Sequence, residues 1–332
     1  TRRCRIARPA PGSRRPAVIA TRARAKVNLA LAVIGRRSDG YHDLVSVFAR
    51  LDLADELTVE ATTGPDRIEM AYGSLTYRPA ADDLVLQAAT LLRTARAPGA
   101  SGLIFRLTKH VPLAAGLGGG SADAAAALEL AARAWGLALT DDELRALAAR
   151  LGSDVPFFAV DVDAALVTGR GEQVEPLPGP LDPVGVLLVT SGPGLVTRAV
   201  FGAWTALDAS AGRAAHDAHA ALAARDLAAR LAAGCSASDV IDMATRLRDA
   251  NDLWPAAVRL RPDLGDLRLA LEAQLDRPLL LSGSGPTFVA LYPSRAAADA
   301  AATALRSDPA SAVPGAAIRT ATFERTITRE AR

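Results

Sequence analysis

The chain has few of the residues that build metal sites and disulfide frameworks. Its 332 residues include two cysteines and four histidines. Cys4 and Cys235 form neither a disulfide framework nor a metal-ligand spacing, and His216 and His219 have no third ligand near them in the sequence. We therefore expect no metal site built from these side chains, and a reducing compartment, the cytoplasm, for the protein.

Long apolar segments, aromatic residues and lysine are also scarce. No run of about 18 apolar residues is present and no apolar signal segment stands near the start, so we expect neither a membrane span nor secretion. Aromatic residues make up 4% of a chain that is 50% hydrophobic, which indicates a globular protein with cores of alanine, leucine and valine. Lysine occurs only as Lys26 and Lys109. A length of 332 residues favours two domains over one.

Acidic residues are missing from the first part of the chain. Residues 1–38 contain eleven arginines and lysines and no aspartate or glutamate, so the formal charge of +2 conceals an acidic body. We expect residues 1–16 to form a disordered basic tail, and residues 326–332 to form a second short tail. Because the body is acidic, the basic balance does not indicate nucleic-acid binding. A non-catalytic nucleotide-binding regulator that uses the tail on nucleic acid is the alternative from another class.

The most informative segment is a glycine-rich stretch at residues 112–123, Pro-Leu-Ala-Ala-Gly-Leu-Gly-Gly-Gly-Ser-Ala-Asp. Gly116 to Gly120 place four glycines in five positions and run into an alanine-rich segment of high helix propensity. We expect Ser121 to cap the N-terminus of that helix. A flexible loop whose backbone N–H groups meet a helix N-terminus binds anions, and the usual anion is phosphate. The segment therefore predicts a nucleotide-phosphate site.

Three other glycine motifs do not fit this segment. A Walker P-loop needs lysine and then serine or threonine after its last glycine, where this chain has Ser121 and Ala122. The dinucleotide fingerprint needs a third glycine at the position of Ser121. A nucleophile elbow needs Gly-x-Ser-x-Gly, which is absent here. A plain glycine-rich connection is disfavoured because a strand, a loop and a helix are expected in that order.

Hydrophobic spacing predicts strands and helices in both halves of the chain. The expected strands cover residues 18–25, 27–36, 44–52, 56–61, 103–109, 184–190, 279–281, 287–292 and 317–323. The expected helices cover residues 83–95, 121–135, 141–151, 196–207, 216–232, 238–250, 263–275 and 295–305, the third with a capping box from Thr140 to Glu143. A Pro- and Gly-rich linker at 177–183 separates an N-terminal domain at 17–179 from a C-terminal domain at 184–325. Mixed helices and antiparallel-looking strands indicate an α+β fold.

Two charged residues in apolar surroundings are candidate catalytic groups. Lys26 stands in Ala-Lys-Val-Asn-Leu at a strand start, and Asp154 stands in Gly-Ser-Asp-Val-Pro-Phe-Phe just past a helix. A lysine at such a position neutralises phosphoryl charge, and a carboxylate beside it stays ionised and accepts a hydroxyl proton. For either residue taken alone, a structural role explains the position at least as well as a catalytic one. That role is a solvated cation at a strand end for Lys26 and an Asx turn for Asp154.

Two turns add candidate binding residues. Asp-Gly-Tyr-His at residues 39–42 carries a ring, Tyr41, that can stack on a base, and an imidazole, His42, that can hydrogen-bond it. The alternative for this segment is an ordinary hairpin tip. Ser-Gly-Ser-Gly-Pro at residues 282–286 is a second glycine loop, which would let two backbones approach closely or present N–H groups to a substrate.

Together these segments resemble the GHMP kinase family. A lysine-containing strand at Lys26, a Pro-x-x-x-Gly-Leu-Gly-Gly-Gly-Ser loop from Pro112 and a C-terminal glycine loop follow one another in the family's order, and the resemblance spans residues 17–323. It implies a two-domain architecture with the active site in the cleft between the domains. It also implies ATP and Mg²⁺, a small-molecule substrate, no nucleic-acid or membrane partner, and a monomer or weak homodimer.

The segments at 25–29, 39–42 and 152–157 are similar to those of family members in the non-mevalonate isoprenoid route. The reaction implied is transfer of the γ-phosphoryl group of ATP to the 2-hydroxyl of a diphosphocytidyl-methylerythritol. The resemblance implies that Asp154 is the base and Lys26 its charge partner. It assigns substrate binding to Asn28, Tyr41, His42, Phe201, Gly283, Ser284 and Gly285. It assigns nucleotide binding to Lys109, Pro112, Gly116, Leu117, Gly118, Gly119, Gly120 and Ser121.

Two positions depart from the family's pattern. Asp83 stands where asparagine is frequent, beside the expected adenine site, and Arg198 stands where proline is common, at the edge of the expected cytidine pocket. The alternative within the family is a kinase with another acceptor, of the homoserine or mevalonate type. Tyr41 and Phe201 argue against it, because two aromatic rings near one pocket suit a nucleobase.

Overall fold

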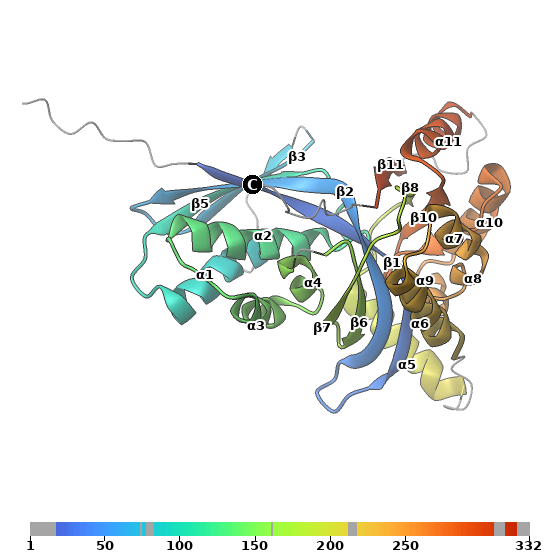
Figure 1. Ribbon diagram of the computed structural model, residues 1–332, viewed down its shortest axis with the longest axis horizontal. Helices are drawn as coiled ribbons and strands as arrows, with labels where there is room; N and C mark the ends of the chain where they lie inside the picture. The colour runs from blue at the N-terminus through green and yellow to red at the C-terminus, as the bar shows by residue number, and fades with distance from the viewer. Residues whose placement is uncertain are drawn as a thin grey trace, which may run out of the picture.

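The computed structural model describes residues 18–73, 75–77, 83–160, 162–211, 218–308 and 316–323. The expected tails at 1–16 and 326–332 lie outside these ranges. Within them, the first sheet occupies one half of the molecule, and its long strands run alongside the second sheet, which lies in the other half (Figure 1). Helices and mostly antiparallel strands occur in both halves, so the predicted α+β class is confirmed.

The first sheet is built around two long antiparallel strands, which pair with each other over most of their length. One end of the second long strand pairs with the strand at 164–169, and its other end pairs with the strand at 102–109. The seven strands of this sheet are β1 (Ile19–Arg36), β2 (His42–Thr62), β3 (Arg67–Tyr72), β4 (Leu75–Tyr77), β5 (Gly102–Lys109), β6 (Ala164–Gly169) and β7 (Gln173–Leu177).

Four helices pack together beside this sheet (Figure 1). They are α1 (Leu84–Arg96), α2 (Gly119–Ala134), α3 (Asp141–Leu151) and α4 (Val155–Ala159). Ten residues of α2 are buried, and most of them are alanine. Because alanine side chains are short, α2 lies close against β1 and β2, which brings its N-terminus next to the middle of β1.

The second sheet has the strand order β11-β8-β10-β9 and is antiparallel throughout. Its strands are β8 (Gly185–Thr190), β9 (Leu280–Leu281), β10 (Thr287–Tyr292) and β11 (Ala317–Thr322). The helices of this half are α5 (Thr197–Ala211), α6 (Ala218–Ala233), α7 (Ala237–Asp242), α8 (Ala244–Leu247), α9 (Trp254–Leu260), α10 (Asp263–Leu275) and α11 (Arg295–Ser307).

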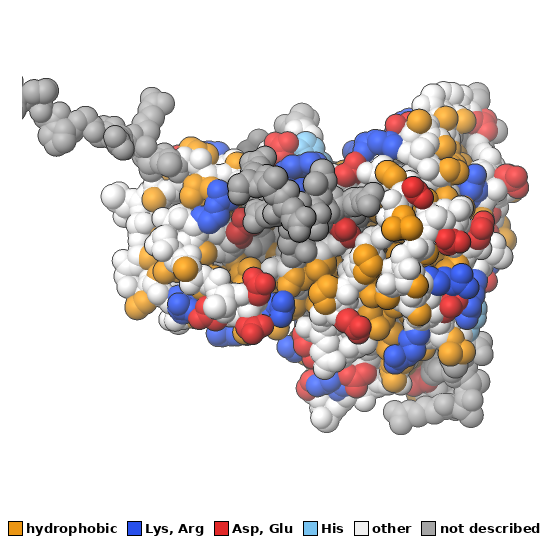
Figure 2. Space-filling view, viewed as in Figure 1, with side chains coloured by type: hydrophobic (Ala, Val, Ile, Leu, Met, Phe, Trp, Pro, Cys, Tyr) orange, Lys and Arg blue, Asp and Glu red, His pale blue; other side chains and the backbone are white. Residues whose placement is uncertain are grey.

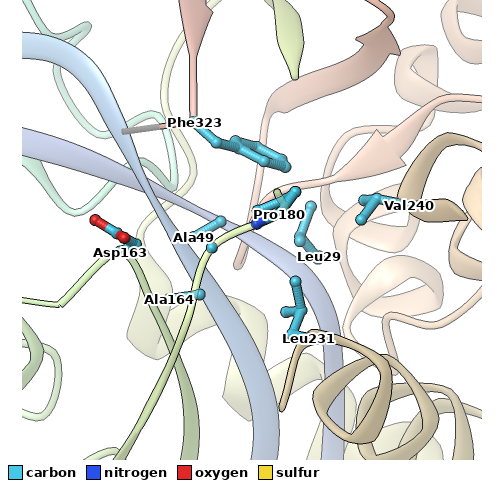
Figure 3. Close-up of a pocket in the computed structure, with 9 residues that line it drawn as sticks. Leu29, Ala49, Asp163, Ala164, Pro180, Leu231, Val240 and Phe323 are labelled. Carbon is cyan, nitrogen blue, oxygen red and sulfur yellow. The ribbon is translucent and has the colours of Figure 1, made fainter. Parts of the chain in front are cut away.

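An apolar core continues from one half into the other. Buried residues of β1 and β2 form one cluster with residues of β8 and α6. Figure 3 shows a crevice at this junction, where Leu29, Leu231, Val240 and Phe323 point toward one another. The lining is apolar except for Asp163, so the crevice is part of the packing between the halves rather than a site for a polar ligand. The division into domains at residues 179 and 184 stays a prediction.

Most of the expected strands and helices are present, and the structure contains several further elements that were not expected. The capping box of Thr140 and Glu143 and the helix at 141–151 are confirmed. The expected helix at 238–250 is wrong, because Met243 separates α7 from α8. The elements that the sequence did not predict are β3, β4, β6, β7, α4 and α9.

No helix of the described ranges has the length and hydropathy needed to cross a membrane. On the face drawn in Figure 2, acidic and basic side chains are interspersed and do not gather by sign.

Candidate active site

The structure brings Lys26 and Asp154 together. Lys26 lies on β1 and is 3% exposed, and Asp154 directly precedes α4. The Lys26 Nζ atom lies 3.4 Å from Oδ2 of Asp154, whose side chain is 33% exposed. The pair thus combines a buried cation with a carboxylate that remains open to a ligand.

The Lys26 ammonium has three further neighbours. It donates to Oδ1 of Asn28 at 2.5 Å and to the carbonyl oxygen of Gly116 at 3.4 Å. It also lies over the ring of Phe48, 4.5 Å from the ring centroid, where a cation is attracted by the negative face of the ring. These contacts hold the charge at the point where β1 passes the glycine loop.

Asn28 is itself buried and is hydrogen-bonded through both its side chain and its backbone. Its Nδ2 atom donates to Oγ of Ser46 at 3.0 Å, and its backbone N–H donates to Oγ of Ser282 at 3.2 Å. Ser46 in turn donates to the carbonyl oxygen of Ala30. Asn28 therefore orients Lys26 directly, and its contact with a substrate stays a prediction.

The glycine loop leads into α2 with its backbone donors exposed to a ligand. The cap of α2 is Gly118, with a φ of 70° and no side-chain hydrogen bond to the helix, so the prediction that Ser121 is the cap is wrong. Glycine accepts this left-handed conformation without strain, which lets the helix begin at Gly119. The first N–H groups of α2 thus have no side-chain partner, and a helix N-terminus of this kind favours an anion.

Close packing explains why positions 118 and 119 of the loop need glycine. A Cβ atom on Gly118 would lie 2.7 Å from Cζ of Phe158 and 3.1 Å from Lys26, and one on Gly119 would lie 3.3 Å from Nζ of Lys109. Gly120 faces open space apart from Leu84 at 4.0 Å.

Pro112 and Leu117 belong to the same segment, and their contact with a nucleotide stays a prediction. Both are buried, and the carbonyl oxygen of Leu117 accepts a hydrogen bond from the backbone N–H of Lys26 at 3.0 Å. Ser121 is the third residue of α2 and is partly exposed.

The second glycine loop packs directly on the first. Oγ of Ser282 donates to the carbonyl oxygen of Gly116 at 3.0 Å. A Cβ atom on Gly283 would lie 3.2 Å from both Oδ1 of Asn28 and the carbonyl oxygen of Gly116. Ser284 is buried, and its Oγ lies 3.2 Å from Oγ1 of Thr197, while Gly285 N–H donates to Ser282. The three motifs of the sequence thus meet at one place, between the two halves of the chain.

The Lys109 ammonium lies between two buried carboxylates, Asp55 on β2 and Asp123 on α2. Its ammonium donates to Asp55 and, at 2.6 Å, to Oδ2 of Asp123. Asp55 also accepts the backbone N–H groups of His110 and Val111, at the start of the glycine loop. Neither aspartate was predicted as a site residue, although an acidic residue beside the alanine run after the loop was a signal for Asp123. Contact of Lys109 with the nucleotide stays a prediction.

The carboxylate pair shifts the ionisation of this cluster. Burial raises the pKa of Asp123, Lys109 lowers it, and the second carboxylate, Asp55, raises it again, so that it lies at about 7. Burial alone would lower the pKa of Lys109, but its two carboxylate partners raise it above the ordinary value.

We expect the Asp123 carboxyl to make the fold less stable as the pH rises. A carboxyl whose pKa is raised on folding holds its proton more tightly in the folded state, so its contribution to stability is present below about pH 4 and is lost as the pH rises through about 7. Thermal unfolding between pH 5 and pH 8 should therefore show the wild type losing stability relative to Asp123→Asn, which does not titrate. Parallel pH dependences for the two proteins would contradict the assignment.

The residues of the expected cytidine pocket come from the hairpin between β1 and β2, which carries Tyr41 and His42, and from α5, which carries Phe201. The His42 ring stacks on Phe201 at 5.1 Å between centroids and meets Trp204 edge-on at 5.3 Å. Nε2 of His42 lies 2.9 Å from Oγ1 of Thr205, and burial lowers the pKa of the imidazole. Phe201 is therefore already stacked on His42.

Tyr41 is 51% exposed, and the guanidinium of Arg170 lies over its ring, 5.1 Å from the centroid. Arg170 belongs to the turn between β6 and β7, a hairpin that the sequence did not predict. One face of the Tyr41 ring is thus covered by a cation.

Asp83 and Arg198, the two departures from the family's pattern, both lie at the start of a helix. Asp83 caps α1, because its Oδ1 atom accepts the N–H of Val85 at 2.9 Å. Arg198 is exposed in the first turn of α5.

Among the described residues, no group of three histidine, cysteine, aspartate or glutamate side chains could hold a metal ion. His216 lies outside the described ranges, and Nε2 of His219 lies 3.2 Å from the carbonyl oxygen of Arg246.

The chain is similar to a family of kinase domains, to individual relatives and to solved structures. Residues 83–161 match the GHMP kinases N terminal domain. The 4-diphosphocytidyl-2-C-methyl-D-erythritol kinase of Rhodopseudomonas palustris is 42% identical over 284 residues, covering 85% of this chain and 91% of that protein. The same enzyme of Methylobacterium radiotolerans is 40% identical over 299 residues, covering 87% and 95% of the two chains.

Solved structures agree with these relatives. A crystal structure of 4-(cytidine 5'-diphospho)-2C-methyl-D-erythritol kinase has a TM-score of 0.65 at 33% identity, covering 91% of this chain and 99% of that one. The L. major mevalonate kinase in complex with R-mevalonate has a TM-score of 0.68 at 15% identity over 95% and 98% of the chains, which shows a common fold. The expected GHMP-kinase-like fold is thereby confirmed.

Proposed function

Because the chain belongs to the 4-diphosphocytidyl-2-C-methyl-D-erythritol kinases of the GHMP kinase family, we propose that it transfers the γ-phosphoryl group of ATP to the 2-hydroxyl of that erythritol derivative. The reaction belongs to the non-mevalonate route to isoprenoid precursors. The observation that carries the proposal is the ion pair of Lys26 with Asp154 beside the glycine loop, at 3.4 Å.

Catalysis in this reaction class is positioning together with electrostatic stabilisation. Asp154 accepts the proton of the substrate hydroxyl, since its carboxylate is open to a ligand on one side and fixed by a cation on the other. Lys26 stabilises negative charge as the hydroxyl oxygen attacks phosphorus, and its burial strengthens that interaction. Asn28 and Gly116 hold the ammonium in place.

The glycine loop binds the phosphates of ATP. The uncapped N–H groups of residues 119–121 point out of the N-terminus of α2, and the absence of Cβ atoms at 118–120 lets phosphate oxygens approach them. The hydrogen bond from the Lys26 N–H to Leu117 holds the loop against β1, and Lys109 ties the start of the loop to α2 through Asp123. Mg²⁺ would be held chiefly by the phosphates, since the described residues offer no cluster of three ligands.

The cytidine end of the substrate lies at the β1–β2 hairpin. Tyr41 stacks on the cytosine with the face that Arg170 leaves open, and His42 and Phe201 form the wall beside it. Asn28 and the loop at Gly283, Ser284 and Gly285 face the part of the substrate between the base and the hydroxyl, which fits their position beside Lys26.

The direct test is release of ADP by the purified protein with ATP and Mg²⁺. We expect release only when 4-diphosphocytidyl-2-C-methyl-D-erythritol is added, and none with homoserine or mevalonate as the acceptor. Turnover with one of those two alcohols would replace the acceptor and keep the reaction class. Failure to turn over any of the three, with ATP still raising the melting temperature, would contradict the acceptor and support a nucleotide-binding protein of another function.

Replacing Tyr41 tests the cytidine end separately. Stacking of an aromatic pair is worth about 0.5–1.5 kcal/mol, so Tyr41→Ala should raise KM for the cytidine substrate by up to about tenfold. KM for ATP, measured in the same experiment, should stay unchanged because Tyr41 lies in a different part of the site. An unchanged KM for the cytidine substrate would contradict the stacking role.

A further inference from the structure

Arg50 lies directly opposite Lys26 in the β1–β2 pair and is 7% exposed. Directly opposed residues of an antiparallel pair project from the same face of the sheet. Lys26 reaches Asp154 on that face, and Arg50 reaches the backbone a few residues further along the chain. Its guanidinium donates to the carbonyl oxygens of Phe157, at 3.3 Å, and Val160, at 2.6 Å.

These two carbonyl groups are at the C-terminal end of α4. A helix of five residues has too few internal hydrogen bonds to be stable alone, and its last carbonyl groups lack partners within the helix. A cation there satisfies the carbonyl groups and complements the partial negative charge of the helix end. The Arg50 guanidinium also lies over the Phe157 ring, 5.5 Å from its centroid.

The other end of α4 carries the carboxylate that faces the substrate. Asp154 is the N-terminal cap of α4, but its side chain makes no capping hydrogen bond. Its carboxylate is therefore held by Lys26 and by the position of the helix. The Phe157 ring of the same helix packs edge-on against Phe48, the ring beneath the Lys26 ammonium.

We propose that Arg50 is a positioning residue for Asp154: it holds α4 at its C-terminal end so that the carboxylate at the other end stays within ion-pair distance of Lys26. The inference rests on the proposed function, in which Asp154 accepts the hydroxyl proton. Two neighbouring strands thus hold one short helix, β1 through Lys26 at its start and β2 through Arg50 at its end.

Arg50→Met should lower kcat by about 10²-fold, because a displacement of about 1 Å in a reacting group has an effect of that size. KM for ATP should change little, since the carbonyl groups to which Arg50 donates lie in and directly after α4 and not in the glycine loop. Arg50→Lys keeps a cation near the carbonyl groups and should recover part of the rate.

Arg268→Met is the matched control for the loss of a buried arginine. Arg268 is 2% exposed, donates to the carbonyl oxygen of Leu279 at 2.8 Å and lies 4.7 Å from the Trp254 ring centroid, so it shares burial, a carbonyl partner and a neighbouring ring with Arg50, and it also pairs with Asp249 and Glu272. It lies on α10, away from α4. Its replacement should lower the melting temperature while kcat falls by less than threefold.

A double-mutant cycle with Asp154→Asn decides between positioning and a general loss of structure. If Arg50 acts through the carboxylate, Arg50→Met should cause no further loss of kcat in the Asp154→Asn protein. An equal loss in both backgrounds, or a wild-type rate in Arg50→Met, would overturn the proposal. If Arg50→Met does not fold, the same cycle is run with Arg50→Gln, which also removes the cation, and the same two results would overturn the proposal. A wild-type rate in Asp154→Asn alone would instead overturn the role of Asp154 in the proposed function.

Discussion

Asp154→Asn is expected to lower kcat by about 10²–10⁴-fold, the usual effect of removing a positioned general base. Asparagine has almost the same shape as aspartate, but it cannot accept a proton from the substrate hydroxyl. The fold should be unaffected, because the Asp154 side chain does not cap α4 and is partly exposed. Single-turnover phosphoryl transfer at saturating ATP and substrate measures the chemical step directly.

Lys26→Met and Asp142→Asn complete this experiment. Lys26→Met removes the cation that fixes Asp154 and stabilises the transition state, and it should lose a similar factor in kcat. Asp142 is an acidic residue in the first turn of α3 with its side chain 93% exposed, so Asp142→Asn should leave the rate unchanged. Retention of near-wild-type turnover by Asp154→Asn would rule out the carboxylate as the base.

Elements with local sequence signals could be predicted from the sequence. Thr140 and Glu143 satisfy each other's backbone N–H groups, so the start of α3 depends on four consecutive residues. Residues 263–275 and 287–292 were likewise predicted with the bounds that the structure has. In each case the apolar spacing and the turn residues agree with the fold.

Elements that depend on a distant partner could not be predicted. β3 is stabilised by parallel pairing with β5, and β7 is a partly exposed strand that contains Pro176. The expected break between two strands near Arg24 is a register shift inside the continuous strand β1. A register shift depends on the partner strand. Its only trace in the sequence is an interruption of the alternation between apolar and polar residues.

The residues of the candidate site also fall into two groups, those that the sequence predicted and those that only the fold reveals. Residue type, sequence context and family resemblance were enough to single out Lys26, Asp154 and the glycine loop. Arg50 and Asp55 were missed because their partners are backbone groups of other elements, which only the three-dimensional fold brings near them. The error at Ser121 has a local cause, since side-chain preference pointed to serine while the positive φ of Gly118 started the helix earlier.

Gly116→Ala is expected to abolish most activity by separating the two glycine loops. Gly116 has a φ of +78°, and a Cβ atom there would overlap the carbonyl oxygen of Ser282 and lie 3.2 Å from Gly285. The obstacles are backbone atoms, which cannot rotate away, so one loop has to move. That movement would break the hydrogen bond from Ser282 to Gly116 and shift the carbonyl group that binds Lys26.

Gly136→Ala isolates the part of this effect that comes from the close approach. Gly136 has a φ of +65°, but no atom lies within 4 Å of the position of its Cβ. Both variants therefore carry the strain of an alanine in the left-handed region, about 1–2 kcal/mol, and only Gly116→Ala adds a steric conflict. We expect Gly136→Ala to unfold at a lower temperature with full turnover, and Gly116→Ala to lose both stability and turnover. Equal turnover in the two variants would mean that contact between the glycine loops is not needed for catalysis, and that the site tolerates a wider gap between the two halves of the chain.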